Sequence, residues 1–151
     1  MITDLPRKKS RGKKEPLHLS LPIPPSVNAI YYNTRKGGRR LTTKAEHYIR
    51  DARALINLAI DEQKWKKQEK GIWLYCDMVF YFPDRRRRDS HNCLKLLLDV
   101  LESYVYVDDM YVLPRILSVE YDKENPRVEI AIVQQSESQR NKGIKDTRVV
   151  I

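Results

Sequence analysis

The feature that most constrains the fold of this chain is a helix predicted over residues 90–104 that is apolar on nearly all sides. The apolar residues between Cys93 and Leu101 cover most of its circumference at about 100° per residue. The polar residues fall on one strip about 100° wide, and they are His91, Asn92, Lys95, Asp99 and Glu102. A helix of this kind is embedded in a core and presents one narrow polar stripe. We therefore expect the other elements of the domain to enclose it.

The remaining patterns predict a single α+β domain with the element order β-α-β-α-β-β. Strands are predicted at residues 17–23, 72–82, 112–121 and 127–133, helices at 43–63 and 90–104, and a loop at 26–40. Thr43 and Glu46 form a capping-box pattern at the start of the first helix. Residues 72–82 carry apolar and aromatic side chains on both faces, which places that strand centrally. The expected architecture is two helices packed on a mixed sheet of about four strands.

Charge and composition limit the class of partner that this chain can have. The chain has 151 residues, a formal net charge of +9 and a sequence pI of about 9.6, so a polyanion is the first expected partner. It has no apolar run of the ~20 residues that span a membrane and no signal-peptide pattern. Cys76 and Cys93 lie in apolar segments and are expected to be reduced thiols of a cytoplasmic protein.

The domain is expected to span residues 17–135. Residues 1–16 form a basic tail that we expect to be disordered, and residues 136–151 form a polar C-terminal tail. Two interpretations of the basic tail remain open, namely contact with a DNA backbone and a solubilising extension.

Residues able to serve phosphodiester chemistry gather around the predicted helix 90–104. Four consecutive arginines, Arg85, Arg86, Arg87 and Arg88, precede Asp89 at its amino end, and Asp108 and Asp109 follow its carboxyl end. Carboxylates bind Mg²⁺ or Mn²⁺, arginines neutralise a phosphodiester, and a lysine stabilises developing charge. Asp89 is equally well placed to cap the helix, so both roles stay open here.

The predicted loop 26–40 places aromatic and basic residues around a Gly37-Gly38 pair. This composition suits contact with phosphates and unstacked bases, although a plain surface loop is the competing interpretation. The candidate DNA contacts in it are Asn28, Tyr31, Arg35, Lys36, Arg39 and Arg40.

Residues 83–95 read Pro-Asp-Arg-Arg-Arg-Arg-Asp-Ser-His-Asn-Cys-Leu-Lys, which resembles the signature of the RusA family of Holliday junction resolvases. That signature is an arginine-rich turn, then Asp-x-Asp-Asn-x-x-Lys, then an Asp-Asp pair after the helix. Asp89, Asn92, Lys95 and Asp109 match it, whereas His91 stands where the family has its second Asp. The resemblance includes the Pro-Pro-Ser-x-Asn-x-x-Tyr run at residues 24–31 and covers residues 17–134.

The resemblance implies a metal-dependent endonuclease that resolves four-way junctions by paired symmetric nicks in DNA recombination and repair. By this resemblance Asp89, Lys95 and Asp109 are catalytic, and Asp89, His91 and Asp109 hold the metal. Asn92, Asp99 and Asp108 support them, and Arg85, Arg86, Arg87 and Arg88 grip the junction.

The implied cofactor is Mg²⁺, with Mn²⁺ preferred if His91 is a ligand, because imidazole nitrogen is a softer donor than a carboxylate oxygen. His91 could instead hydrogen-bond a phosphate or a ligating carboxylate. Two coordinated nicks on opposed strands need two active sites, so we expect a homodimer. By the resemblance such genes are often carried by prophages, and we expect neither a membrane nor an organic cofactor to be involved. The alternatives are a nuclease acting on flaps or other branched DNA, and a junction-binding protein without catalysis.

Overall fold

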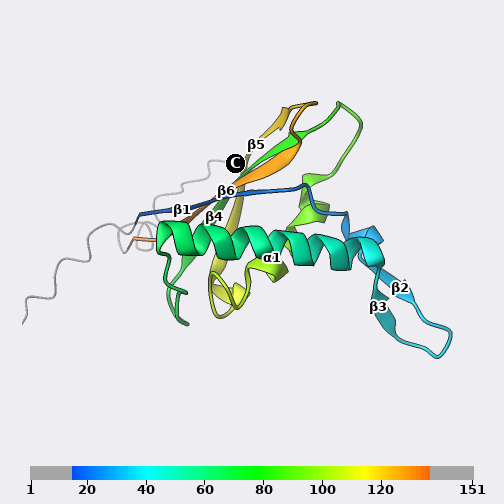
Figure 1. Cartoon of the computed structure of the whole chain (residues 1–151), viewed down its shortest axis with the longest axis horizontal. Helices are drawn as coiled ribbons and strands as arrows, with labels where there is room; N and C mark the ends of the chain where they lie inside the picture. Colours follow the sequence, from blue (N-terminus) through cyan, green and yellow to red (C-terminus); the bar gives the residue numbers. More distant parts are fainter. Residues whose placement is uncertain (1–14, 137–151) are drawn as a thin grey trace, which may run out of the picture.

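Four strands pair into a mixed sheet in the order β1-β6-β4-β5, and two helices accompany it (Figure 1). The computed structural model describes residues 15–136, so the tails predicted at 1–16 and 136–151 lie almost wholly outside the described residues. The main elements are β1 (Leu17–Leu21), α1 (Thr43–Gln63), β4 (Leu74–Phe82), α2 (Leu94–Leu101), β5 (Val112–Tyr121) and β6 (Arg127–Gln134). The predicted α+β class and its element order are confirmed.

β4 is an interior strand, as its apolar character predicted. It pairs in parallel with β5 and antiparallel with β6, which in turn pairs antiparallel with β1. β5 forms one edge of the sheet and tolerates Pro114, because an edge strand has one side on which a missing N–H breaks no ladder bond.

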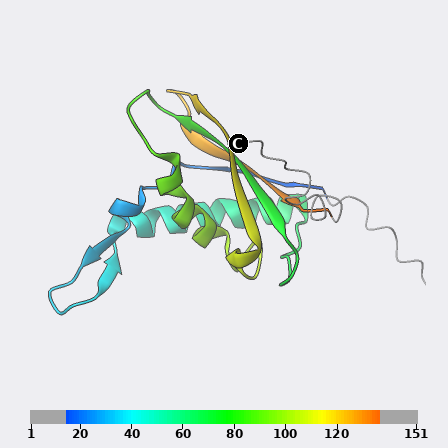
Figure 2. The same ribbon diagram turned by 180° about the vertical axis from the view of Figure 1, so that it is seen from behind.

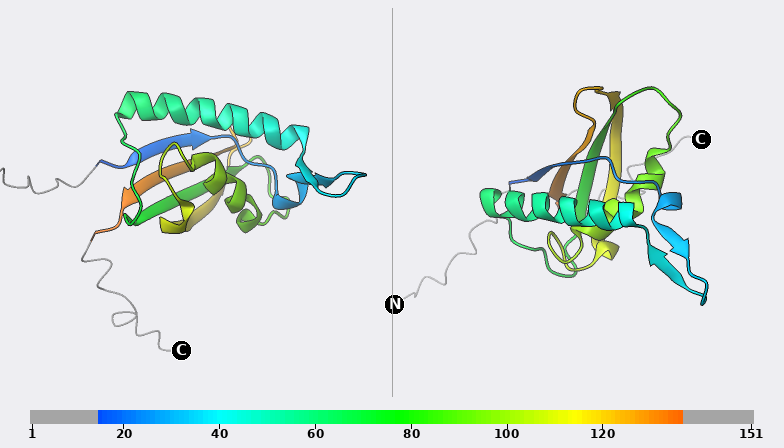
Figure 3. Two further views of the ribbon diagram at one scale, coloured as in Figure 1. Left: turned by 90° about the horizontal axis from the view of Figure 1, so that it is seen from below. Right: turned by 45° about the vertical axis from the view of Figure 1, so that its right-hand side comes forward.

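The core lies on one face of the sheet, and both helices pack there (Figures 1 and 3). Every second residue of β4 is buried, from Leu74 through Phe82, and β1 and β6 alternate in the same way. Helix α1 contributes Ala45, Tyr48, Ala52 and Ile56 to the core, and α2 contributes Leu96, Leu97, Val100 and Leu101. The apolar circumference of α2 is therefore matched by a sheet on one side and a helix on another.

Helix α1 has the predicted bounds, but its capping residue lies one position before the threonine of the predicted capping box. Thr42, rather than Thr43, is the N-cap, and its hydroxyl accepts the N–H of Ala45 at 3.2 Å. The helix ends where Lys64 adopts a left-handed conformation with φ of 53°.

Two segments differ from the sequence-based prediction. Residues 26–40, predicted as a loop, contain a 3-10 turn (η1, Val27–Ala29) and an antiparallel hairpin of β2 (Tyr31–Asn33) and β3 (Arg39–Leu41). Strands of three residues are too short to show a period in the sequence. The helix predicted at 90–104 is a 3-10 turn (η2, Ser90–Cys93) followed by α2, which ends at Leu101.

Helix α2 ends early because the chain after it turns back onto the helix. Ser103 adopts a positive φ of 73°, and its N–H donates to the carbonyl of Tyr106 at 2.7 Å. The buried Tyr106 hydroxyl then donates to the carbonyl of Leu98 at 2.6 Å. Gln68 holds the returning chain from the other side, since it bonds both Val105 and Val107 through its backbone. This return leads to η3 (Asp109–Tyr111) beside the end of α2.

Both cysteines are free and buried, as the sequence suggested. Among residues 15–136, no helix is long and apolar enough to span a bilayer.

Replacing Tyr106 by Phe should lower the free energy of unfolding by about 1 kcal/mol, because the carbonyl of Leu98 loses its hydroxyl partner in a buried setting. Urea denaturation of the two proteins measures the difference. Tyr32→Phe is the matched control, because the Tyr32 side chain is 49% exposed. Equal stability of the Tyr106 variant and the wild type would contradict this account of how the return is held.

Candidate active site and DNA-binding surface

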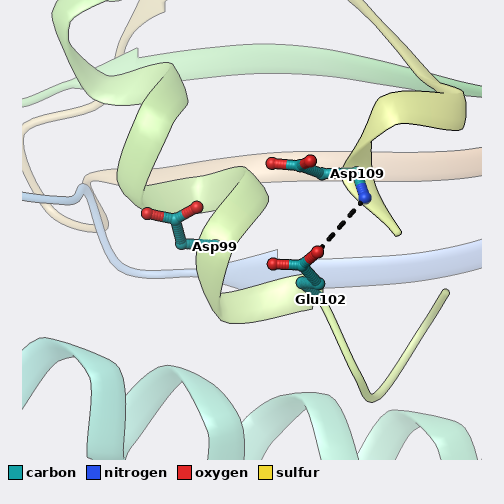
Figure 4. A group of neighbouring side chains, drawn as sticks. All are labelled: Asp99, Glu102 and Asp109. Atoms are coloured by element: carbon teal, nitrogen blue, oxygen red, sulfur yellow. Dashed lines mark hydrogen bonds between the residues drawn. The ribbon is translucent and has the colours of Figure 1, made fainter. Parts of the chain in front are cut away.

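Three carboxylates converge where the chain returns to the end of α2 (Figure 4). Asp99 lies on α2, Glu102 follows its last residue, and Asp109 begins η3. One oxygen from each side chain lies within 4.8 Å of the others, and all three residues are partly buried. The backbone N–H of Asp109 donates to Oε1 of Glu102 at 3.4 Å, which ties η3 to the end of the helix.

The acidic cluster, meaning Asp99, Glu102 and Asp109, carries an excess of negative charge. Burial raises the pKa of Asp99, and the neighbouring Asp109 raises this pKa further. Lys95 and Arg53 act in the opposite direction on the pKa of Asp99. Carboxylate oxygens are the ligands that Mg²⁺ and Mn²⁺ prefer, and a divalent cation would offset the repulsion between the carboxylates. The donor set therefore fits a hard divalent ion.

The two adjacent aspartates at this site have different environments. The Asp108 side chain caps η3 by accepting the N–H of Met110 at 3.0 Å. Asp109 instead contributes its carboxylate to the acidic cluster.

Asp89 lies at the other end of the helical segment, where it is the N-cap of η2. Its Oδ1 accepts the backbone N–H of His91 at 3.0 Å and lies 3.0 Å from Nδ1 of the same residue. These bonds from His91 lower the pKa of Asp89. Both side chains are exposed, at 58% for Asp89 and 77% for His91. The capping role left open from the sequence is thus present, and the His91 ring contacts a carboxylate.

The sequence-based metal set of Asp89, His91 and Asp109 does not come together as a trio in the described part of the chain. Asp109 lies beside Asp99 instead, and Asp99 is eight residues after His91. At about 2.0 Å per residue in the 3-10 turn and 1.5 Å in α2, this corresponds to roughly 13 Å along the segment. The polar stripe therefore has two ends, with Asp89 and His91 at the amino end and the acidic cluster at the carboxyl end.

Lys95 and Asn92 lie along the stripe between these ends. Lys95 is exposed and close enough to Asp99 to lower the pKa of that carboxyl. Asn92 is half-buried, and its backbone N–H donates to the carbonyl of Asp89 at 3.1 Å.

The four arginines of the turn after β4 do not have equal freedom. Arg88 bonds both the carbonyl and Oδ1 of Asp84 and lies over the Phe82 ring. Arg85 lies over the ring of Tyr121, with 4.6 Å between its Cζ and the ring centroid. The Arg86 side chain is 85% exposed and its nearest carboxylate contact, to Asp84, is 3.9 Å long.

Arg87 is also exposed. Arg86 and Arg87 are thus left exposed to solvent, while Arg88 shapes the turn.

The predicted DNA contacts of residues 26–40 are divided between two elements. Asn28 is exposed on η1, whereas Tyr31 and Arg39 are on the hairpin and contact each other, with the guanidinium 4.6 Å from the ring centroid. Arg35, Lys36 and Arg40 are exposed at or near the hairpin tip.

Two residues at the acidic cluster were not among the sequence-based candidates. Glu102 was visible as a member of the polar stripe, three residues after Asp99, but its pairing with Asp109 depends on the return of the chain. Arg53 comes from α1, where its guanidinium lies 5.3 Å from the Tyr104 ring and close to Asp99. No local sequence pattern links Arg53 to this site.

The fold and these surfaces describe a basic α+β domain in which one helical segment follows a turn of exposed arginines and ends at a cluster of carboxylates, as expected of a nuclease. The family model for Endodeoxyribonuclease RusA matches residues 22–133. The chain therefore belongs to the RusA family of endodeoxyribonucleases. The comparison with curated proteins gave no match.

Replacing Asp84 by Ala should loosen the arginine turn, because the carboxylate accepts both the N–H of Arg86 and the guanidinium of Arg88. Amide hydrogen exchange should become several-fold faster over residues 84–89 and remain unchanged in β6. Glu124→Ala is the control, since it removes another exposed carboxylate from a different turn. Unchanged exchange in the Asp84 variant would mean that this carboxylate does not hold the turn.

Proposed function

We propose that this protein is a metal-dependent endonuclease that resolves Holliday junctions by paired symmetric nicks during DNA recombination and repair. The family match over residues 22–133 carries this proposal, because it covers nearly the whole described domain. The acidic cluster supports the metal dependence, and the net charge of +9 supports a nucleic-acid substrate.

In this proposal the protein binds the junction backbone through Arg86 and Arg87, while Arg88 and Asp84 hold the turn in shape. Lys95 stabilises the charge that develops on the scissile phosphate. The ion, when bound, supplies positive charge against the phosphodiester and lowers the pKa of an attacking water. Asp109 holds this ion, and either of two sets of partners completes the site.

The first set is Asp89 and His91, as the family resemblance implies, with Mn²⁺ then preferred over Mg²⁺. The second set is Asp99 and Glu102, whose oxygens already lie near Asp109 and are all hard donors, which suits Mg²⁺. In the second set Asp89 and His91 act outside the metal site. The 3.0 Å contact between them would then orient Asp89 toward the DNA or toward a water.

Titration of the protein with Mn²⁺ in a calorimeter, without DNA, should separate these ligand sets. Asp109→Asn should weaken Mn²⁺ binding by roughly 10-fold or more in either case, because a charged donor is removed. Glu102→Gln should do the same only if the acidic cluster holds the ion, and His91→Asp should strengthen binding only if residue 91 is a ligand. Asp108→Asn is the control and should bind as the wild type does.

Cleavage of a synthetic mobile four-way junction tests the activity itself. Asp109→Asn and Asp89→Asn should reduce cleavage by about 100-fold or more while junction binding is kept, since each change preserves shape and removes charge. Cleavage of flaps but not junctions would establish the alternative branched-DNA nuclease. Tight junction binding without cleavage in either Mg²⁺ or Mn²⁺ would instead establish a binding protein.

We further propose a homodimer working in the cytoplasm. Two coordinated nicks on opposed strands need two active sites, and a two-fold symmetric pair of chains supplies them in the right relation. Light scattering of the free protein should give twice the mass of the 17.9 kDa chain. The complex should contain the same mass of protein once the mass of the junction is subtracted. A single chain on the junction under cleaving conditions would contradict the dimer.

A further inference from the structure

The hairpin of β2 and β3 is a strongly basic projection of the described structure. Residues 31–41 contain Arg35, Lys36, Arg39 and Arg40 and no acidic residue. Figures 1 and 2 show the hairpin extending beyond the end of α1, away from the sheet and both helices. Its charge is therefore presented to the surroundings and is not neutralised by its own strands.

The tip of the hairpin has a preset shape. The N–H of Thr34 donates to the carbonyl of Gly38 at 3.0 Å, and the Thr34 hydroxyl donates to the carbonyl of Gly37 at 2.9 Å. Gly37 and Gly38 have φ values of 79° and 103°, which a residue with a side chain rarely adopts. Such a tip loses little conformational entropy when it binds.

The base of the hairpin is fixed to the core. The N–H of Thr42 donates to the carbonyl of Ile30 at 2.8 Å, and its hydroxyl donates to the carbonyl of Ala29 at 2.7 Å. Thr42 is also the N-cap of α1, so the hairpin is mounted on a helix of 21 residues. The base of the hairpin is thus held in a fixed position relative to α1.

The hairpin also begins beside the candidate active site. The 3-10 turn η1, which immediately precedes β2, packs against η2, the turn that Asp89 caps. The thiol of Cys93 in η2 lies 3.8 Å from the carbonyl of Pro24, which comes shortly before η1 in the chain. DNA that reaches Asp89 therefore passes close to the base of the hairpin.

The two faces of the hairpin differ. On one face Arg39 covers the Tyr31 ring, and Tyr31 and Leu41 pack against the core. On the other face Tyr32 is 49% exposed and pairs across the strands with the exposed Arg40. An exposed aromatic ring beside an arginine is a surface on which unpaired bases stack.

We propose that this hairpin enters the branch point of the DNA and selects branched substrates over linear duplex. The tip residues Arg35 and Lys36 bind the phosphates that surround the opening, and an unstacked base lies on Tyr32. The inference rests on the proposed function, since it names the part of the substrate that the site recognises.

A groove of a duplex arm is the competing location, since a major groove about 12 Å wide admits a two-stranded ribbon. Tyr32 distinguishes the two locations. In a duplex the bases are already stacked on one another, and an aromatic ring finds an open base face only where pairing is broken.

The test measures binding to a four-way junction and to a linear duplex of one arm, in the absence of divalent ions. Tyr32→Ala should weaken junction binding roughly 10-fold and leave duplex binding unchanged, while Tyr32→Phe, which keeps the ring, should bind both as the wild type does. A 2-aminopurine base at the branch point should lose fluorescence on binding of the wild type but not of Tyr32→Ala.

The double substitution Arg35→Gln/Lys36→Gln tests whether the tip binds phosphates. It should reduce the dependence of log K on log salt by about 0.9 for each phosphate that the variant no longer neutralises. Lys66→Gln/Lys67→Gln, beyond the opposite end of α1, is the charge-matched control and should leave the junction slope unchanged. An unchanged slope in the tip variant would overturn the assignment of Arg35 and Lys36 to the phosphates.

If Tyr32→Ala binds the junction as tightly as the wild type, or weakens junction and duplex binding equally, the hairpin does not enter the branch point. This result is distinct from failure of the proposed function, which would appear as a wild-type protein with no preference for the junction over the duplex.

Discussion

Parallel pairing of β4 with β5 is the constraint on which the site depends. Two parallel neighbours cannot be joined by a tight turn, so the chain must cross from one end of the sheet back to the other. Helix α2 makes this crossing while buried against the sheet, and its narrow polar stripe is the part left uncovered. Both ends of the crossing carry acidic residues, with Asp89 entering it and Asp109 leaving it. The candidate active site is thus a consequence of how two strands are connected.

The stripe gathers charge that the rest of the fold then balances. At its carboxyl end Asp99, Glu102 and Asp109 repel one another, and Lys95 and Arg53 relieve only part of that repulsion at Asp99. At its amino end the Asp89 carboxylate accepts the backbone N–H of His91 and contacts the ring of the same residue. The carboxyl end therefore has the larger excess of negative charge, which a bound cation would reduce. The basic surfaces, on the arginine turn and on the hairpin, lie near the amino end, where the turn leads directly into Asp89.

Basic residues that look alike in the sequence serve different purposes in the fold. Arg88 holds Asp84 and Arg85 lies over Tyr121, so half of the arginine turn is occupied in shaping or covering the protein itself. Arg86 and Arg87 remain exposed. The hairpin repeats this division, because Arg39 covers Tyr31 whereas Arg35 and Lys36 are at the open tip. Identical side chains in the sequence therefore differ in whether they are free to bind a partner, and the fold decides which of them are.

The sequence by itself determined the α+β class, the order of the main elements, the central place of β4 and the polar stripe of α2, because all of these follow from local periodicity and apolar content. It also contained the motif that marks the family. Only the tertiary structure decided that Glu102 faces Asp109, that Asp108 is a cap, and that Arg88 is structural. The first of these depends on the return of residues 102–108, which Tyr106 and Gln68 hold. The other two are contacts within the turns themselves, from Met110 to Asp108 and from Arg88 to Asp84, which no sequence pattern had singled out. The hairpin was not predicted because three-residue strands are too short to show a period in the sequence. Its shape comes from pairing between the two strands and from the bond of Thr42 to Ile30 at its base.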